Sequence, residues 1–292
     1  MSKRIEVVIN PASGQPQPIL NTLNKVFREN EVAYNVSLTQ ESGDARRFAK
    51  KAASEGADVV AAYGGDGSVM EVAQGLMGTE VPLAILPGGT ANLMSVELGI
   101  PRDLAKAAQV ASSDESVVRK VDMGEADDHK FMLRVGIGFP AEKVILADRD
   151  LKDKYGLAAY TIAAFKAMDT SQQVAYTLNL DGEQFDVDGI GCRIDNSSNI
   201  GVPGVSVNPS TDVSDGYFDV LIWQEIDLSF SSVTDRMRNK DTSDDLYHHW
   251  QAKEITISTD QPQPIQGDGE VWGNPPISIK VLPGAMRVLV PK

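Results

Sequence analysis

The N-terminal part of the chain repeats one pattern: a short apolar run ends in a glycine-rich turn, and a helical pattern follows. The three turns are residues 10–14 (NPASG), 64–68 (GGDGS) and 87–92 (PGGTAN). Strands that alternate with helices form a parallel sheet, with the helices as crossover connections. We therefore predict a Rossmann-like, doubly wound parallel α/β domain over residues 1–122.

Hydrophobic periodicity and capping residues locate the elements of this domain. Asp44 is the expected N-cap of one helix and Gly56 its stop. Strands are expected over residues 4–10, 32–39, 58–65 and 81–89. Helices are expected near residues 19–27, 44–57, 68–78, 90–100 and 104–112.

The pattern changes near residues 121–124, where runs of strand type begin to follow one another. Gly, Asp, Asn and Pro stand at the turns between them, which is typical of an antiparallel sandwich or barrel. One helical insertion is expected at residues 157–169. We predict a β-rich domain of one of these two types over residues 123–281. Its strands are expected near residues 131–139, 174–182, 183–194, 217–226, 253–260 and 277–283, and a last strand follows near residues 286–292.

Charge and composition exclude several classes of protein. The chain has 27 Lys and Arg against 41 Asp and Glu, a net charge of −14, which argues against a nucleic-acid partner. No apolar run approaches the roughly 18–20 residues of a membrane span, so no transmembrane segment is expected. The first residues, MSKRIEVVIN, lack the features of a signal peptide, and the chain has a single cysteine. We expect a cytoplasmic protein.

The glycine-rich turns indicate an anion site. Ligands of open parallel sheets bind beyond the carboxyl ends of the strands, where glycines let backbone N–H groups approach a phosphate. Ser13, Ser68 and Thr90 add hydroxyl donors, while the P-loop lysine pattern is absent. A G-x-G-x-x-A match at residues 136–141 opens the β-rich half and contains Pro140, so we do not interpret it as a dinucleotide fingerprint.

Two acidic clusters lie in the β-rich half, at residues 215–219 (DGYFD) and 266–270 (QGDGE). An isolated Asp-Gly pair is ordinary turn chemistry. Asp268 and Glu270, however, place two carboxylates two residues apart in a loop. Such a pair can hold Mg²⁺ or take a proton from a hydroxyl group.

Other reactive residues give weaker indications of a functional site. His248 and His249 lack partners at metal-ligand spacing, and Cys192 reads as a buried small hydrophobe. The basic residues Arg46, Arg47, Lys50 and Lys51 read as a solvated helix face. No G-x-S-x-G or H-E-x-x-H motif occurs, which removes the simplest hydrolase interpretations.

Taken together, five segments resemble the diacylglycerol kinase catalytic family, which includes bacterial soluble lipid kinases and sphingosine kinases within the NAD-kinase-like superfamily. They are residues 10–14, 64–76, 86–101, 215–219 and 267–270, in order along nearly the whole chain. The resemblance implies an N-terminal α/β nucleotide domain, completed by the last strand at residues 282–292, and a C-terminal antiparallel β-sandwich over residues 123–281. It implies an ATP-dependent lipid kinase of phospholipid metabolism that phosphorylates diacylglycerol or a related lipid.

The resemblance also implies roles for residues. Glu270 is the proton acceptor, and Asp268 is its neighbour in the acid and metal network. Asp215 holds Mg²⁺ with the backbone carbonyls of Asp212 and Tyr217. ATP lies over Asn10, Pro11, Ala12, Ser13, Gly14, Thr39, Gly64, Gly65, Asp66, Gly67, Ser68, Val69, Met70 and Thr90.

The sequence departs from the family pattern at several places. Ser68 stands where Thr is usual, Leu93 where Asp is common, and Pro140 where an acidic residue is frequent; residues 201–205 (GVPGV) are poorer in glycine. The implied partner is a lipid acceptor at a membrane surface, reached by peripheral contact, and a homodimer is left open. Two alternatives remain: a kinase for a soluble acceptor, such as an NAD kinase, or a degenerate nucleotide-binding regulator. The only Asn-Glu pair, at residues 30–31, lies upstream of the GGDG segment and counts against the first.

Overall fold

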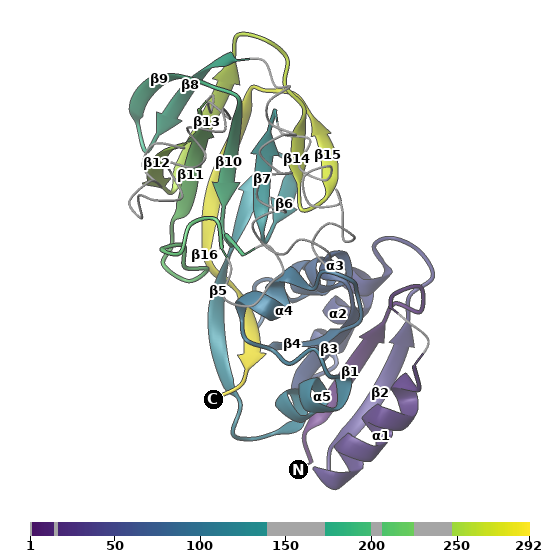
Figure 1. The fold of residues 1–292 in the computed structure, drawn as a ribbon. Helices are drawn as coiled ribbons and strands as arrows, with labels where there is room; N and C mark the ends of the chain where they lie inside the picture. The colour runs from purple at the N-terminus through teal and green to yellow at the C-terminus, as the bar shows by residue number, and fades with distance from the viewer. Residues whose placement is uncertain (1, 15–16, 139–172, 200–205, 225–246) are drawn as a thin grey trace, which may run out of the picture. The chain divides into compact units, whose positions relative to one another are not determined.

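The computed structural model describes residues 2–14, 17–138, 173–199, 206–224 and 247–292 (Figure 1). The helix expected at residues 157–169 lies outside these residues. The chain divides into two compact units. Unit 1 comprises residues 1–123, 197–215 and 282–292, and unit 2 comprises residues 124–196 and 216–281. The segment 197–215 thus belongs to unit 1, whereas the predicted second domain, residues 123–281, includes it.

Unit 1 contains a parallel sheet with the strand order β2-β1-β3-β4-β16. Its strands are β1 (Arg4–Ile9), β2 (Ala33–Leu38), β3 (Val59–Gly64), β4 (Leu83–Pro87) and the end of β16 (Ile277–Val290). Strands β3 and β4 are buried along their whole length, as expected for the centre of a parallel sheet. The chain leaves β1 toward β2 and then returns to the other side of β1 as β3. The strand order therefore reverses between β1 and β3, which is where such sheets bind ligands.

Five helices of unit 1 are α1 (Ile19–Glu29), α2 (Asp44–Ser54), α3 (Asp66–Leu76), α4 (Leu93–Glu97) and α5 (Leu104–Ser112). Four of them pack in two pairs, α1 with α5 and α2 with α3 (Figure 1). This pairing gives the sheet the helix layers of a doubly wound fold. Among the described residues, no helix combines the length and the hydrophobicity that a membrane span needs.

The start of α2 corrects one prediction. The N-cap is Gly43, in the left-handed conformation with φ 86°, and Asp44 is the first helical residue. The Asp44 carboxylate instead accepts hydrogen bonds from the backbone N–H groups of Gln40 (2.9 Å) and Glu41 (3.2 Å). Those bonds, with Arg47, hold the pKa of Asp44 below its ordinary value. Asp44 therefore orders the chain before the helix rather than capping it.

Unit 2 is an antiparallel sandwich. One sheet contains β16, β13 (Glu254–Thr259), β8 (Val174–Leu180) and β9 (Glu183–Gly189). The other has the order β12-β11-β10-β7-β14-β15. Its strands are β12 (Tyr247–Ala252), β11 (Phe218–Trp223), β10 (Gly191–Asp195), β7 (Arg134–Ile137), β14 (Ile265–Gly267) and β15 (Glu270–Gly273). The remaining strands of the described residues are β5 (Val117–Ala126) and β6 (His129–Phe131).

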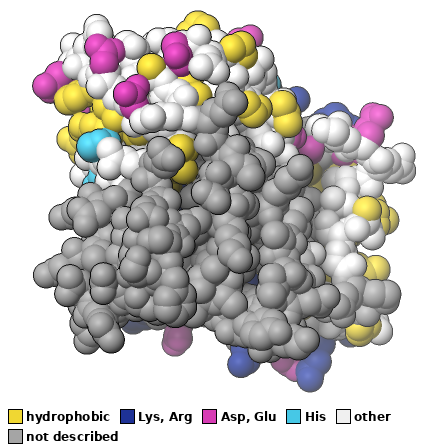
Figure 2. Space-filling view, turned by 45° about the horizontal axis from the view of Figure 1, so that its top comes forward, with side chains coloured by type: hydrophobic (Ala, Val, Ile, Leu, Met, Phe, Trp, Pro, Cys, Tyr) yellow, Lys and Arg dark blue, Asp and Glu magenta, His cyan; other side chains and the backbone are white. Residues whose placement is uncertain are grey.

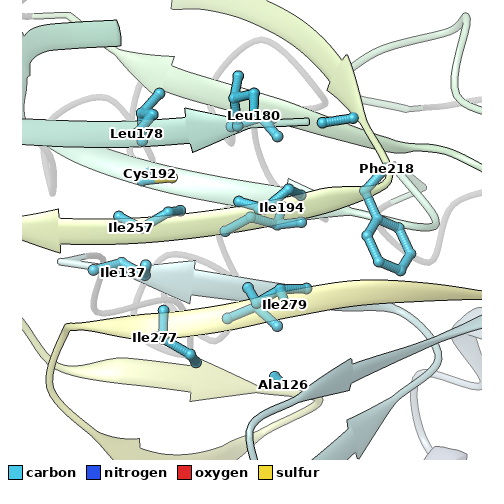
Figure 3. Close-up of a cluster of buried hydrophobic side chains, with 14 of the residues drawn as sticks. Ala126, Ile137, Leu178, Leu180, Cys192, Ile194, Phe218, Ile257, Ile277 and Ile279 are labelled. Carbon is cyan, nitrogen blue, oxygen red and sulfur yellow. The ribbon is translucent and has the colours of Figure 1, made fainter. Parts of the chain in front are cut away.

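The core of unit 2 lies between its two sheets (Figure 3). Leu178, Ile257 and Ile279 come from one sheet and face Ile137 and Ile194 of the other. Burying such side chains is worth roughly 1.5–3 kcal/mol each, so the alternation of apolar and polar residues fixes which face of each strand turns inward. Cys192 is fully buried in the same cluster, which confirms its interpretation as a small hydrophobe. Burial raises the pKa of its thiol.

Several strand predictions were wrong in detail. The runs 277–283 and 286–292 form one strand, β16, and the run 183–194 is divided into β9 and β10. Strands β5 and β12 were not expected. The QGDGE segment, expected as a loop, is the β14–β15 hairpin.

Candidate active site

A cleft of about 730 Å³ opens in unit 1 at the carboxyl ends of β1 and β3. It therefore lies at the reversal of strand order. The lining residues come from the turn after β1, from the GGDGS turn and α3, and from residues 39–45, which lead into α2. They are Asn10, Pro11, Ala12, Ser13, Thr39, Gln40, Glu41, Ser42, Ala45, Gly65, Gly67, Ser68 and Glu71.

The turn after β1 is built by Asn10. Its side-chain oxygen accepts a hydrogen bond from the Ala12 N–H (3.0 Å), and its backbone oxygen accepts one from the Ser13 N–H (3.1 Å). Its amide nitrogen donates to the Ser68 hydroxyl (3.1 Å). Asn10 thus fixes its own turn and joins it to the first turn of α3.

Two glycines of the turns are required for different reasons. A Cβ on Gly14, which has φ +83°, would lie 2.3 Å from the Gly88 carbonyl oxygen. The turn after β1 therefore packs directly on the PGGTAN turn. A Cβ on Gly67 would meet no atom within 4 Å, although Gly67 lines the cleft. That glycine leaves room for a ligand rather than for protein atoms.

Asp66 holds the third turn. Its carboxylate accepts hydrogen bonds from the N–H groups of Leu93 (3.1 Å) and Met94 (3.2 Å) at the start of α4. Asn92, in the left-handed conformation, closes the same turn through its contacts with Gly89. Asp66 therefore connects the GGDGS and PGGTAN turns.

Glu71 was not found from the sequence. Its carboxylate accepts hydrogen bonds from the N–H groups of Gly43 (3.0 Å) and Ala45 (3.1 Å) and from the Ser42 hydroxyl (3.3 Å). It thereby satisfies the N-terminus of α2 and positions one wall of the cleft. Its spacing of three residues from Ser68 puts both on one face of α3, and this was the available signal.

The predicted nucleotide residues fall into two groups. Eight of them line the cleft: Asn10, Pro11, Ala12, Ser13, Thr39, Gly65, Gly67 and Ser68. Gly14 lies outside the lining and packs against Gly88. Val69 and Met70 are buried in the core of α3, and Thr90 is exposed on the third turn. Gly64 accepts hydrogen bonds from the N–H groups of Gly88 (2.8 Å) and Gly89 (3.1 Å).

The predicted metal residues lie in one exposed turn. The Asp212 carboxylate pairs with Arg119 (2.7 Å) and accepts the Ser214 N–H (3.0 Å). The Asp215 N–H donates to the Asp212 carbonyl at 3.4 Å, a long hydrogen bond. The Tyr217 ring lies 4.5 Å from the Lys253 ammonium group. A carboxylate and carbonyl oxygens form a donor set suited to a hard cation such as Mg²⁺.

In unit 2, Glu270 begins β15 at the turn of the β14–β15 hairpin and is exposed. The hairpin is packed by Trp272, whose ring stacks on His129 at 4.7 Å and covers Gly267 so closely that a Cβ there would overlap it. The exposed Glu270 carboxylate therefore stands on an ordered turn.

Asp268, unlike Glu270, has its carboxyl group bound to the protein backbone. It adopts φ +46°, and its carboxyl group is buried although the residue keeps some exposed surface. The carboxylate accepts hydrogen bonds from the N–H groups of Met132 (2.7 Å), Leu133 (3.1 Å) and Arg134 (2.9 Å). Burial raises the pKa of Asp268 to about 6, although these three bonds lower it.

The two neighbouring histidines each contact a polar partner. His249 Nε2 lies 2.5 Å from the carboxylate of Asp219, a buried residue, and His248 Nε2 lies 2.7 Å from the Gln224 amide. Among the described residues, no group of three or more His, Cys, Asp or Glu side chains has the arrangement of a metal site.

Figure 2 shows one face of the molecule, on which acidic side chains stand among hydrophobic and uncharged ones. Among the described residues of that face, lysine and arginine side chains do not form a broad field, in keeping with the net charge of −14.

Two known domain models match the chain in succession. The diacylglycerol kinase catalytic domain matches residues 4–126, and the YegS C-terminal NAD kinase beta sandwich-like domain matches residues 134–290. The chain belongs to the family that joins a diacylglycerol kinase catalytic domain to a YegS C-terminal domain. This confirms the family inferred from the five motifs and makes the protein a member of a lipid-kinase family.

The chain is also similar to individual proteins along nearly its whole length. The chain is 27% identical to the diacylglycerol kinase of Bacillus subtilis, over 99% of the chain and 97% of that protein. A crystal structure of a Bacillus anthracis diacylglycerol kinase is similar in fold, with a TM-score of 0.76 at 23% identity, over 99% of the chain and 97% of that structure.

Proposed function

We propose that the protein transfers the γ-phosphoryl group of ATP to the hydroxyl group of a lipid, diacylglycerol or a close relative. The observation that carries the proposal is the cleft at the β1–β3 reversal, with Gly67 and Ser68 at the start of α3. A helix N-terminus favours anions because its first N–H groups are free and its dipole is positive there. The space beside Gly67 suits a phosphate chain that approaches the backbone closely.

Phosphoryl transfer requires positioning and charge neutralisation more than covalent chemistry. In the proposed reaction, N–H groups of the GGDGS turn and the hydroxyls of Ser13, Ser68, Thr39 and Thr90 bind ATP. The acceptor oxygen attacks the γ-phosphorus, the bond to the β-phosphate oxygen breaks, and ADP leaves. Glu270 accepts the proton of the acceptor hydroxyl. Its exposure leaves the carboxylate accessible to an acceptor hydroxyl.

We further propose that Asp215 holds Mg²⁺ together with the carbonyls of Asp212 and Tyr217. When bound, Mg²⁺ supplies positive charge and order to this acidic turn. These oxygen donors suit Mg²⁺. The Asp212 carboxylate is paired with Arg119, so the Asp212 carbonyl is the oxygen that we propose binds the ion. The lipid acceptor implies peripheral contact with a membrane from the cytoplasm.

A substrate screen tests the proposal. Purified protein, radiolabelled ATP and Mg²⁺ are incubated with mixed micelles that contain diacylglycerol, monoacylglycerol, sphingosine or phosphatidylglycerol, and separately with NAD. The proposal expects label in a lipid product and none in NAD. Label in NADP would favour the soluble-acceptor kinase, and ATP binding without any transfer would favour the regulator.

A further inference from the structure

Asp268 forms hydrogen bonds to a segment far from it in sequence, within unit 2. Its two carboxylate oxygens receive three consecutive backbone N–H groups, those of Met132, Leu133 and Arg134, at 2.7–3.1 Å. The Asp268 N–H returns a bond to the Arg134 carbonyl (3.1 Å). The turn of the β14–β15 hairpin is thus fastened to residues 132–134 in both directions.

The same segment is held from its other side by Asn196. The Asn196 amide nitrogen donates to the Met132 carbonyl (2.7 Å), and its backbone N–H donates to the Leu133 carbonyl (2.9 Å). Asn196 is fully buried. Residues 132–134 therefore form a fixed support, and the position of the turn is set by how Asp268 binds to it.

This arrangement bears on metal binding. A carboxylate has about four lone-pair directions, and three donors in a buried setting occupy most of them. A metal ion at these oxygens would have to displace hydrogen bonds from three backbone N–H groups. The geometry favours a structural use of the carboxylate over a metal ligand.

We infer that Asp268 is a positioning residue, which fixes the turn that carries Glu270 and acts on catalysis only through it. The inference rests on the proposed role of Glu270 as proton acceptor. Glu270 follows Asp268 by two residues, and Gly269 between them adopts φ +94°, so the direction of the Glu270 side chain depends on the conformation of this turn. A displacement of about 1 Å in a catalytic group can cost about 10²-fold in rate.

The chain offers a matched control. Asp181 also adopts a positive φ (51°), precedes a glycine in a hairpin turn, and accepts backbone N–H groups of Lys253 (3.0 Å) and Glu254 (2.8 Å) with its carboxylate. It lies in the β8–β9 hairpin of unit 2 and is exposed. Asp181→Asn makes the same chemical change in the same kind of turn.

The experiment compares Asp268→Asn, Asp181→Asn, Glu270→Gln and the double variant Asp268→Asn/Glu270→Gln in the lipid kinase assay. We expect Asp268→Asn to lower kcat about 10²-fold, with KM for ATP and the Mg²⁺ requirement unchanged, and Asp181→Asn to leave kcat within twofold. The double variant should be no slower than Glu270→Gln, because the positioning of an absent base has no effect. Hydrogen exchange should quicken at residues 132–134 in Asp268→Asn and only near residues 253–254 in Asp181→Asn.

Three results overturn the inference. Recovery of Asp268→Asn by added Mg²⁺ would make Asp268 a metal ligand. Losses that multiply in the double variant would give it an independent role. Full activity of Asp268→Asn, when Glu270→Gln is inactive, would show that Asp268 has no role in catalysis. Full activity of Glu270→Gln would instead refute the proton acceptor assigned in the proposed function. If Asp268→Asn does not fold, Asn196→Ala releases the same support from its other side and must lower kcat with the same dependence on Glu270.

Discussion

The side-chain amide of Asn10 donates a hydrogen bond to the hydroxyl of Ser68 across 3.1 Å. This bond joins the turn after β1 to the start of α3, the two segments that border the reversal of strand order. The two walls of the proposed phosphate site are therefore set relative to each other by side chains, before any ligand binds.

Replacing Ser68 tests this contact. Ser68→Ala removes a donor to phosphate and the partner of Asn10, and a hydrogen bond of this kind is worth about 1 kcal/mol. We expect the Kd for ATP, measured by calorimetry, to rise about five- to tenfold, while Ser68→Thr stays near the parent. Ser54→Ala, which changes an exposed hydroxyl at the end of α2, is the control. An unchanged Kd in Ser68→Ala would remove the hydroxyl from the site.

Gly67→Ala should change stability and binding in opposite directions. Gly67 lies in the first turn of α3, and its added Cβ meets no protein atom within 4 Å. Alanine in a helix is favoured over glycine by up to about 1 kcal/mol, so Tm should rise or stay constant. The same Cβ occupies space in the cleft, so the affinity for ATP should fall. A variant that binds ATP as tightly as the parent would place the phosphates elsewhere.

The stability of unit 2 should depend on pH through Asp268. Burial raises its pKa from 3.8 to about 6, so the folded state binds the proton more tightly than the unfolded state does. The stabilisation from this proton is complete below about pH 4 and is lost as the pH rises through 6, a change of up to about 3 kcal/mol. Asp268→Asn has no carboxyl group at this position, so its stability should lack this pH dependence.

Urea unfolding at pH 4 and pH 7 measures this effect, followed by the fluorescence of Trp223, Trp250 and Trp272, the three tryptophans of the chain. All three lie in unit 2. As the pH rises from 4 to 7, the unfolding free energy of the parent should fall relative to that of Asp268→Asn by up to about 3 kcal/mol. A difference that stays constant over this range contradicts the raised pKa.

Mg²⁺ should stabilise the parent through Asp215. A ligand at 100 times its Kd adds about 2.7 kcal/mol to the stability of the folded state. We expect a chelator to lower the Tm of the parent and to leave the Tm of Asp215→Asn unchanged. Asp114→Asn, at a fully exposed carboxylate of unit 1, should respond to the chelator as the parent does. Equal responses of all three proteins would remove the ion from this turn.

The sequence predicts the local elements of unit 1 well because alternating apolar strands and amphipathic helices carry strong periodic signals. The position of β1 between β2 and β3 could not be predicted, since chain order does not determine strand order. Glu71 was missed for a related reason. Its partners at residues 42–45 lie some 26 residues away, and only the packing of α2 on α3 brings them together.

Unit 2 was harder to predict. β14 has three residues and contains Gly267, whose lack of a side chain serves the packing of Trp272 rather than strand formation. β12 begins with Tyr247 and two histidines, which show no alternation of apolar and polar residues. Asp268 and Glu270 were found together as an acidic pair. Their division into a buried carboxylate bound to backbone N–H groups and an exposed one depends on the hairpin turn, which short-range pattern does not reveal.

The most direct test of the proposed function is the steady-state rate of lipid phosphorylation by Glu270→Gln. The substitution keeps the shape of the side chain and removes its basicity, and general-base assistance is worth about 10²–10⁴-fold. With diacylglycerol in mixed micelles and saturating ATP, we expect the parent to form phosphorylated lipid and the variant to lose kcat by about that factor, with the Kd for ATP unchanged. A kcat within about threefold of the parent would contradict the assignment of Glu270.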